Sequence, residues 1–344
     1  MSADQEEIAT SLAASKEYEA EVAQQAAADH TAALAGHAKA VLTGTLLALV
    51  SAVLYTLTNM CLRAASKCDI YWVSCLKAVP TLIVAAAIVA NRRRLGLPNF
   101  PGMRTTVTLV LTGLLAHIGG NAAFQYGLSI VGLAASVPLT FSMIIVGGSL
   151  LGRFYLGEAI SVRSAAAMGL LCISIALLGL HTEHAKPSDT LPRPDALTIA
   201  VAVGVTCFSG LAYAVLGVVI RRNVTGSVNS SVVLLTISIS GIVSLGAITL
   251  GRIGLSGMTA TTTDDLHAML WAGTFNAGGF FLLTRALQLI PVAYVNVINA
   301  SQTAMAAIAG VLYFHEPSTT ALYGGVGLMT TGILLMDRPR HKAS

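Results

Sequence analysis

The chain has 344 residues, of which 55% are apolar and only 10% are Asp, Glu, Lys or Arg. Soluble domains carry roughly 25% charged residues, so this composition excludes a soluble globular protein, a disordered chain, a coiled coil and a nucleic-acid-binding protein. Residues 1–40 carry two Lys and seven acidic residues, net −5, whereas the rest of the chain carries 18 basic and nine acidic residues, net +9. An acidic polar tail therefore precedes an apolar body that needs lipid as its solvent.

The apolar body contains ten runs of roughly 20 residues, the length that a helix needs to cross a bilayer. Gly and Ala within these runs suit close packing between helices in lipid. Alternating segments of about ten residues, as in membrane barrels, are not found. We therefore expect an all-α integral membrane protein with ten transmembrane helices, at residues 41–62, 70–90, 105–126, 131–152, 162–180, 196–220, 230–250, 267–289, 291–313 and 318–336.

The distribution of Lys and Arg between the loops predicts the orientation. The tail at residues 1–40 begins with acidic residues, whereas a secretory signal begins with basic ones. If this tail lies inside, the inner loops and the C-terminus hold eleven Lys and Arg residues and the outer loops hold five. Because cytoplasmic loops are enriched in these residues, we expect both termini in the cytosol and the body in the cell (inner) membrane.

The sequence also contains an internal repeat. An offset of 158 residues places Tyr55 on Tyr213 and Arg63 on Arg221, and an offset of 159 places Gly119-Gly120 on Gly278-Gly279. Each half has five spans, an odd number, so the second half must enter the membrane in the opposite orientation. Inverted repeats are common in secondary transporters, whose substrate site lies between the halves near the bilayer midplane.

This repeat predicts the organisation of the chain: two inverted five-helix repeats joined by a linker that contains three prolines. The predicted parts are a cytosolic tail at 1–40, a first repeat at 41–180, a linker at 181–195, a second repeat at 196–337 and a cytosolic C-terminus at 338–344.

Two matching motifs follow the fourth span of each half, Phe154–Glu158 and Leu312–Glu316. With five spans in each half, and with Lys77 early in the second span, the chain resembles the EamA-type branch of the drug/metabolite transporter (DMT) superfamily over about residues 41–337. The resemblance implies a central cavity lined by spans 1, 3, 4, 6, 8 and 9. The chain departs from the family in span 9, where Asn296 stands at the position of Pro138 in the first half.

Polar side chains inside the spans form stripes at helical spacing. His117, Asn121 and Gln125 follow each other at i, i+4 and i+8 in span 3. Such a stripe is either a structural seam between helices or a surface that faces substrate, and ionisable residues within spans tend to face cavities. The candidate substrate-binding residues are Tyr55, Asn59, Lys77, His117, Asn121, Gln125, Thr140, Tyr213, Asn276, Asn296, Asn299 and Gln302.

Charged residues in or beside the spans need a specific explanation, since a charge at the bilayer centre costs about 2.5–3.5 kcal/mol. Lys77 either extends to the outer interface or lines the cavity and faces an anionic group of the substrate. Glu158 and Glu316 come just before the next helix, and we expect each to stabilise the N-terminus of that helix. Asp264 and Asp265 suggest the same role before span 8.

The motifs favour transport over catalysis. No Walker-type ATP motif, metal-ligand spacing or catalytic constellation occurs in the sequence, so we expect no enzyme activity, no cofactor and no metal. The predicted function is a secondary transporter, or permease, that moves a small polar metabolite or drug-like solute by alternating access. Its expected partners are that substrate and membrane lipid, without nucleic acid, and a homodimer stays open. The alternatives are a lipid-linked-sugar or nucleotide-sugar carrier, a channel and a membrane-embedded lipid-modifying enzyme.

Overall fold

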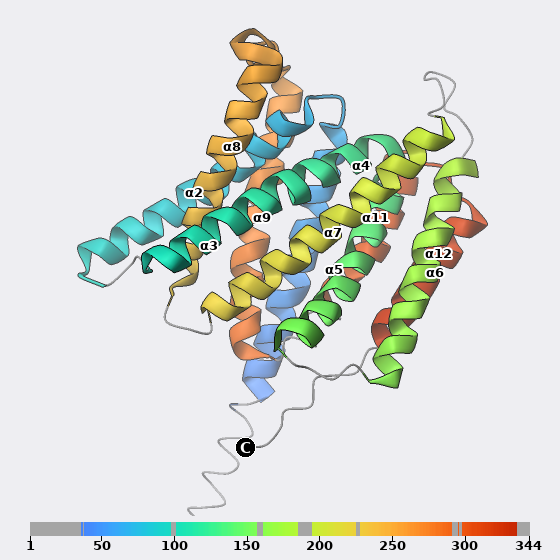
Figure 1. Ribbon diagram of the computed structural model, residues 1–344, viewed down its shortest axis with the longest axis horizontal. Helices are drawn as coiled ribbons and strands as arrows, with labels where there is room; N and C mark the ends of the chain where they lie inside the picture. Colours follow the sequence, from blue (N-terminus) through green and yellow to red (C-terminus); the bar gives the residue numbers. More distant parts are fainter. Residues whose placement is uncertain are drawn as a thin grey trace, which may run out of the picture.

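In the computed structural model the chain folds into a bundle of long helices (Figure 1). The structure describes residues 36, 38–97, 101–156, 161–184, 195–224, 228–290, 295 and 298–335, and these contain no strand. The first long helix is Ala38–Ala64. It is followed by α2 (Ile70–Arg94), α3 (Met103–Leu114), the π-helix η1 (Leu115–Ala122), α4 (Ala123–Val131), α5 (Leu133–Leu156), α6 (Val162–His184), α7 (Ala196–Val224), α8 (Ser230–Thr259), α9 (Thr263–Leu289), α11 (Ser301–Leu312) and α12 (Thr320–Leu335).

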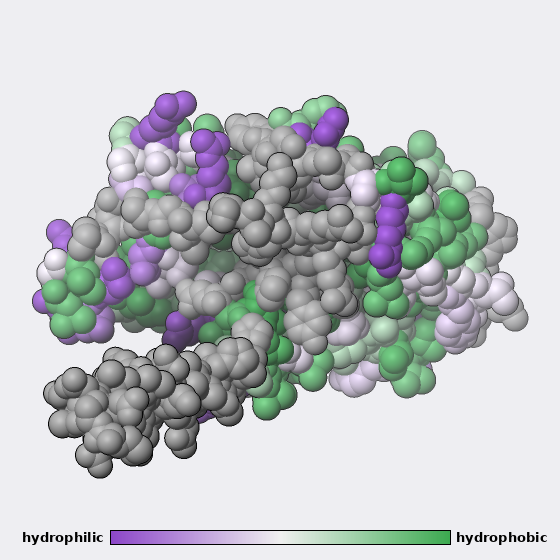
Figure 2. Space-filling model, turned by 90° about the horizontal axis from the view of Figure 1, so that it is seen from below, coloured by the Kyte–Doolittle hydropathy of each residue, from purple (hydrophilic) through white to green (hydrophobic). Residues whose placement is uncertain are grey.

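The outer surface of this bundle suits lipid. Large apolar side chains such as Ile83, Leu111 and Val243 are more than half exposed, and hydrophobic residues lie open at the surface in Figure 2. Six helices among the described residues are long and apolar enough to cross a membrane: Ala38–Ala64, Ile70–Arg94, Met103–Val131, Leu133–Leu151, Ala196–Ile220 and Ser230–Thr259. The chain is therefore an all-helical integral membrane protein.

Several boundaries differ from the sequence-based prediction. The third span runs from Met103 to Val131, longer than predicted at both ends, and it contains the π-helical segment. The helix α6 continues to His184, so the first four residues of the predicted 181–195 linker are helical. The rest of that linker except Asp195, most of the 1–40 tail and residues 338–344 lie outside the described residues.

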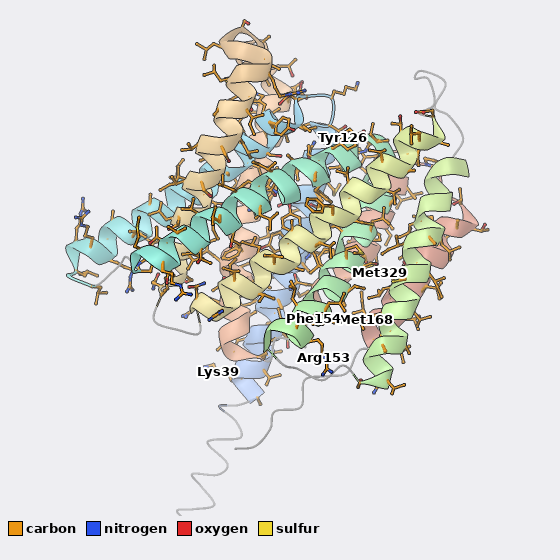
Figure 3. The ribbon with its side chains drawn as sticks, in the orientation of Figure 1. Lys39, Tyr126, Arg153, Phe154, Met168 and Met329 are labelled. Atoms are coloured by element: carbon orange, nitrogen blue, oxygen red, sulfur yellow. The ribbon has the colours of Figure 1, made fainter. Side chains whose placement is uncertain are left out.

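The helices pack mainly across the two halves of the chain. The helix α5 packs on α7, α6 on α12, and α2 on both α8 and α9, while α3 packs on α8 and α11 on α5. Figure 1 shows α6 beside α12 and α5 beside α7. Lys39 and Arg153, both expected on the inner side, lie at the same end of the bundle (Figure 3). The core therefore lies between residues that precede and residues that follow the linker.

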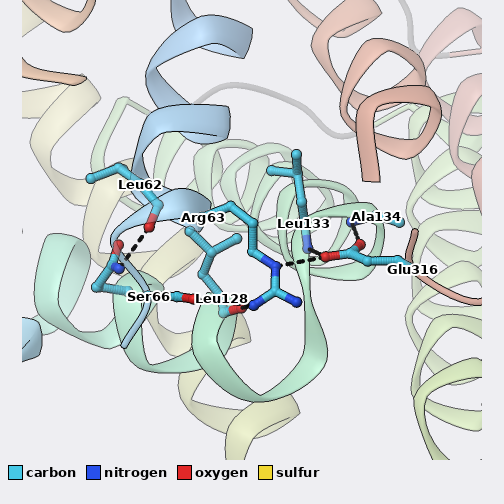
Figure 4. Close-up of polar contacts among 8 residues, drawn as sticks. Leu62, Arg63, Ser66, Leu128, Leu133, Ala134 and Glu316 are labelled. Atoms are coloured by element: carbon cyan, nitrogen blue, oxygen red, sulfur yellow. Dashed lines mark hydrogen bonds and ion pairs between the residues drawn. The ribbon is translucent and has the colours of Figure 1, made fainter. Parts of the chain in front are cut away.

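At one end of the bundle the two halves are joined by the carboxylate of Glu316 (Figure 4). Its oxygens accept hydrogen bonds from Leu133 N at 2.7 Å and Ala134 N at 2.8 Å, and from Arg63 Nε at 2.8 Å. An anion at the N-terminus of α5 meets free backbone N–H groups and the positive end of the helix dipole. We call this group, together with Gly310, the Glu316 junction.

Glycine is required on both sides of the Glu316 junction. Gly132 has a φ of +80°, and a Cβ there would lie within 3 Å of the Glu316 carboxylate. A Cβ on Gly310 would lie 2.5 Å from Glu316 Oε2 and 2.9 Å from Ala134 N. The close approach of α11 to α5 therefore depends on the missing side chain at Gly310.

The predicted role of Glu316 was wrong in one respect. It stabilises a helix N-terminus, but that helix is α5 in the other half and not the helix that follows it. The reason is local: His315 has a φ of +53°, and Glu316 N donates to Gly310 O in the turn that follows α11. Its counterpart Glu158 lies outside the described residues. At α9, in contrast, Asp264 and Asp265 do lie in the first helical turn, as predicted.

Candidate functional site

A cavity of about 370 Å³ lies inside the bundle. Its walls come from the first helix, α2, η1, α4, α5, α7, α8 and α9, and from Asn299 and Gln302 around the start of α11. The volume falls in the range typical of small-molecule sites, which is roughly 300–1,000 Å³. The second span of each half, α2 and α8, contributes to the walls in addition to the spans implied by the family resemblance.

The most polar wall is a hydrogen-bonded group that we call the Lys77 cluster: Lys77, His117, Asn121 and Tyr213. Asn121 Oδ1 accepts from Lys77 Nζ at 2.5 Å and from Tyr213 OH at 2.6 Å. Asn121 Nδ2 lies 3.0 Å from His117 Nδ1, a hydrogen bond when that nitrogen carries no proton. Lys77 is only 8% exposed, so it lines the cavity and does not extend to the interface.

The local backbone places this cluster. His117 and Asn121 both lie on η1, and π-helical turns inside α-helices are frequent at functional sites. Gly120 belongs to the same segment, and a Cβ there would lie 2.9 Å from the Tyr213 ring. A Cβ on Gly241 of α8 would collide with the His117 ring. These two glycines let α7 and α8 approach η1 closely enough to hold the two aromatic rings beside Asn121.

A second polar wall lies at the start of α11. Asn299 Nδ2 donates to Val295 O at 3.1 Å, and Gln302 Nε2 donates to Asn299 Oδ1 at 3.0 Å. Between these residues lies Ala300, whose φ of −62° and ψ of −19° are close to helical values, and α11 begins at Ser301. The two amide side chains thus bind each other at the start of α11, and both line the cavity.

The structure brings ten of the twelve predicted site residues to the cavity wall: Tyr55, Asn59, Lys77, His117, Asn121, Thr140, Tyr213, Asn276, Asn299 and Gln302. Asn296 lies outside the described residues. Gln125 is not among the residues that line the cavity. It is 1% exposed, and its Nε2 donates at 3.0 Å to the carbonyl of Leu62, the neighbour of Arg63 at the Glu316 junction (Figure 4).

Sequence reasoning missed several lining residues, notably Thr58, Thr81, Ser238 and three phenylalanines, Phe124, Phe141 and Phe280. Helical spacing points to three of these, because Thr81 lies one turn beyond Lys77, Phe280 one turn beyond Asn276 and Phe124 one turn beyond Asn121. Phe141 has no such signal, since aromatic residues in a span serve lipid contact and core packing equally well. Within the described residues no group of three His, Cys, Asp or Glu side chains could hold a metal ion.

Comparison with known proteins agrees with this architecture. Twenty solved chains match the fold. One of them, described as "Crystal structure of protein", has a TM-score of 0.57 and 15% sequence identity over 85% of this chain and 95% of its own length. At that identity the similarity supports the fold alone. No curated protein sequence matches the chain. Residues 200–337, which contain the Leu312–Glu316 motif, match the EamA-like transporter family. The second half of the chain is therefore similar to this family, which agrees with the resemblance that the motif indicated there.

Proposed function

We propose that the protein is a secondary transporter that carries a small polar metabolite or drug-like solute across the membrane by alternating access. The observation that carries this proposal is the 370 Å³ cavity, which lies inside a membrane bundle and receives lining residues from both halves of the chain. A binding site between two halves is what a rocking carrier needs, because each side of the site then moves with a different half.

We further propose that the halves are inverted five-helix repeats, and equivalent contacts support this. Gly120 of η1 lies against Tyr213 of α7, and Gly279 of α9 lies against Tyr55 of the first helix. The repeat exchanges these two contacts, since Tyr55 corresponds to Tyr213 and Gly120 to Gly279. It likewise exchanges the α2–α9 contact with the α3–α8 contact, and both are present.

In this proposal the Glu316 junction closes one end of the cavity. Arg63 comes from the end of the first span, and Glu316 follows α11, so the ion pair joins elements of both halves. The Lys and Arg distribution puts this end outside, with both termini in the cytosol. Opening of the outer end then requires Glu316 to leave Arg63 and the N-terminus of α5.

The cavity wall also bears on the alternative carriers. A nucleotide-sugar or lipid-linked-sugar carrier must compensate the charges of a pyrophosphate, which proteins bind with several Arg, Lys or backbone N–H groups. Among the described lining residues Lys77 is the only Lys or Arg. A small solute with little charge fits this wall better.

Counterflow in liposomes tests the function. The purified protein is reconstituted in vesicles loaded with a metabolite extract of the host cells, and exchange with an isotope-labelled extract outside is followed by mass spectrometry. We expect a saturable exchange that empty vesicles lack. A channel gives flux without counterflow, and an enzyme produces a compound that neither extract contained; either result overturns the proposal.

Topology is tested separately with reporter fusions. A reporter after Ser344 is expected to report the cytosol, and a reporter inserted between residues 185 and 194 is expected to report the outer side. If both report the same side, the halves do not contain odd numbers of spans and the inverted repeat is wrong.

A further inference from the structure

We propose that the solute carried in the cavity is a small organic anion with a single negative charge, most simply a carboxylate attached to an apolar body, and that the Lys77 cluster binds the charged group. This inference rests on the proposed transport function and names its substrate class. Three features of the cavity support it: an uncompensated cation, unused donors and a cation that the other half of the chain does not repeat.

The first feature is the charge of the wall. Lys77 is buried on α2 and lines the cavity, and the described lining residues include no Asp or Glu. Two acidic residues of the described chain, Glu316 and Asp69, pair with Arg63 and Arg252 and not with Lys77. A buried cation without a carboxylate partner is unfavourable in a membrane interior, and an anionic ligand removes that penalty when it binds.

The second feature is the hydrogen-bonding capacity of the cluster. An ammonium group has three N–H donors, and one of them is directed at Asn121 Oδ1. No other acceptor for Lys77 Nζ is found within the described residues. Because Asn121 Oδ1 also accepts from Tyr213 OH, it fixes the positions of both groups beside the cavity. A carboxylate oxygen next to Lys77 would supply the acceptor that this wall lacks.

The third feature is that the other half of the chain does not repeat the pair formed by Lys77 and Asn121. The repeat places Phe280 opposite Asn121 and Asn276 opposite His117, and all four residues line the cavity. The second span of the other half, α8, contributes Leu234, Ile237 and Ser238 where α2 contributes Lys77. The duplicated fold does not require this asymmetry, because both halves build the same helices. It fits a ligand with a charged end and an apolar end.

A single cation also limits the charge of the ligand. Phosphate dianions are bound by Arg, by several Lys or by helix N-termini, each of which supplies several donors. The Lys77 cluster has one formal positive charge and otherwise neutral donors. It therefore matches one carboxylate better than a phosphate or a dicarboxylate.

The experiment measures the charge of the exchanged solutes and how their exchange depends on the side chain at position 77. The vesicles and the metabolite extract are those of the counterflow assay, used with wild type, Lys77→Gln and Lys77→Arg. We expect monoanions to dominate the exchanged compounds of the wild type. Lys77→Gln should raise the half-saturation concentration of these monoanions by roughly 10- to 150-fold, the effect of losing a charged hydrogen bond. Lys77→Arg, which keeps the charge, should retain most of the exchange.

Each outcome has a distinct meaning. Exchange of neutral or cationic solutes by the wild type overturns the anion proposal and leaves the transporter standing. Monoanion exchange that Lys77→Gln does not weaken, in protein of normal melting temperature, overturns the role of Lys77. If Lys77→Gln does not fold, Lys77→Arg and the charge of the wild-type solutes still decide the question. No exchange of any solute by wild type overturns the proposed function itself.

Discussion

The Glu316 junction and the Lys77 cluster both join the two halves of the chain through polar groups, yet they differ in how those groups are satisfied. At the junction, the Glu316 carboxylate receives two backbone N–H groups and the Arg63 guanidinium, and glycines leave no space around it. In the cluster, Lys77 has one acceptor among the described residues and faces a cavity. Burial alone therefore does not identify a binding residue, whereas a polar group with unused hydrogen-bonding capacity beside open space does.

This contrast separates two kinds of expected mutant. Changes at the Glu316 junction should lower the free energy of unfolding, because the whole network is internal to the protein. Changes in the Lys77 cluster should mainly lower affinity, because part of its bonding capacity is directed at the cavity.

The largest effect is expected for Gly310→Leu. The new side chain would overlap Glu316 and Ala134, so α11 must move away from α5 and the junction must open. We expect a loss of about 3 kcal/mol or more, seen as a strong fall in folded yield and melting temperature. Gly327→Leu is the matched control, because a Cβ at exposed Gly327 meets nothing within 4 Å. Equal yields for the two variants would contradict the close approach.

The next effect is expected for Glu316→Gln, which keeps the shape of the side chain and removes its charge. The charged hydrogen bonds to α5 and the ion pair with Arg63 weaken together, and we expect a loss of about 2–3 kcal/mol in thermal unfolding. Arg63→Gln should cost less, because the two backbone bonds of Glu316 remain and Arg63 is 24% exposed. A larger loss for Arg63→Gln would mean that the ion pair, and not the α5 N-terminus, holds the junction.

A smaller effect on stability is expected for Gln125→Leu. The variant loses the bond from Gln125 Nε2 to the Leu62 carbonyl, at a cost of about 1–2 kcal/mol. Counterflow per folded molecule should stay unchanged, because Gln125 does not line the cavity. A clear rise in the half-saturation concentration with a normal melting temperature would mean that Gln125 binds substrate.

The smallest effect is expected for Tyr213→Phe, with Tyr55→Phe as its equivalent in the other half. Tyr213 OH donates to Asn121, whereas Tyr55 makes no hydrogen bond to another described residue. Losing one neutral hydrogen bond costs about 1 kcal/mol, which is roughly a fivefold loss of affinity in counterflow. Tyr55→Phe should change affinity less. A larger loss of affinity for Tyr55→Phe than for Tyr213→Phe would contradict the difference in hydrogen bonding between the two tyrosines.

Sequence patterns predicted the helical membrane fold and most of the polar cavity wall, and one miss shows their limit. His117, Asn121 and Gln125 share a stripe by spacing, but spacing reports only which face of a helix a residue occupies. It does not report depth, and Gln125 lies two turns beyond His117, at the Leu62 carbonyl outside the cavity. The partner of Glu316 was equally hidden, because a contact between residues 183 positions apart in sequence depends on how the halves dock.

The packing of helices across the halves has a consequence for how the protein is made. During synthesis the first half enters the membrane before α7, α8, α9, α11 and α12 exist, so α2 and α5 at first lack the surfaces that later bury them. Until α7 and α8 have been inserted, Lys77 can be bound only by residues of its own half, such as Asn121. Insertion and assembly are therefore separate stages. If the chain is divided into two polypeptides between residues 185 and 194, the two should associate in the bilayer, and neither should reach the mature fold alone.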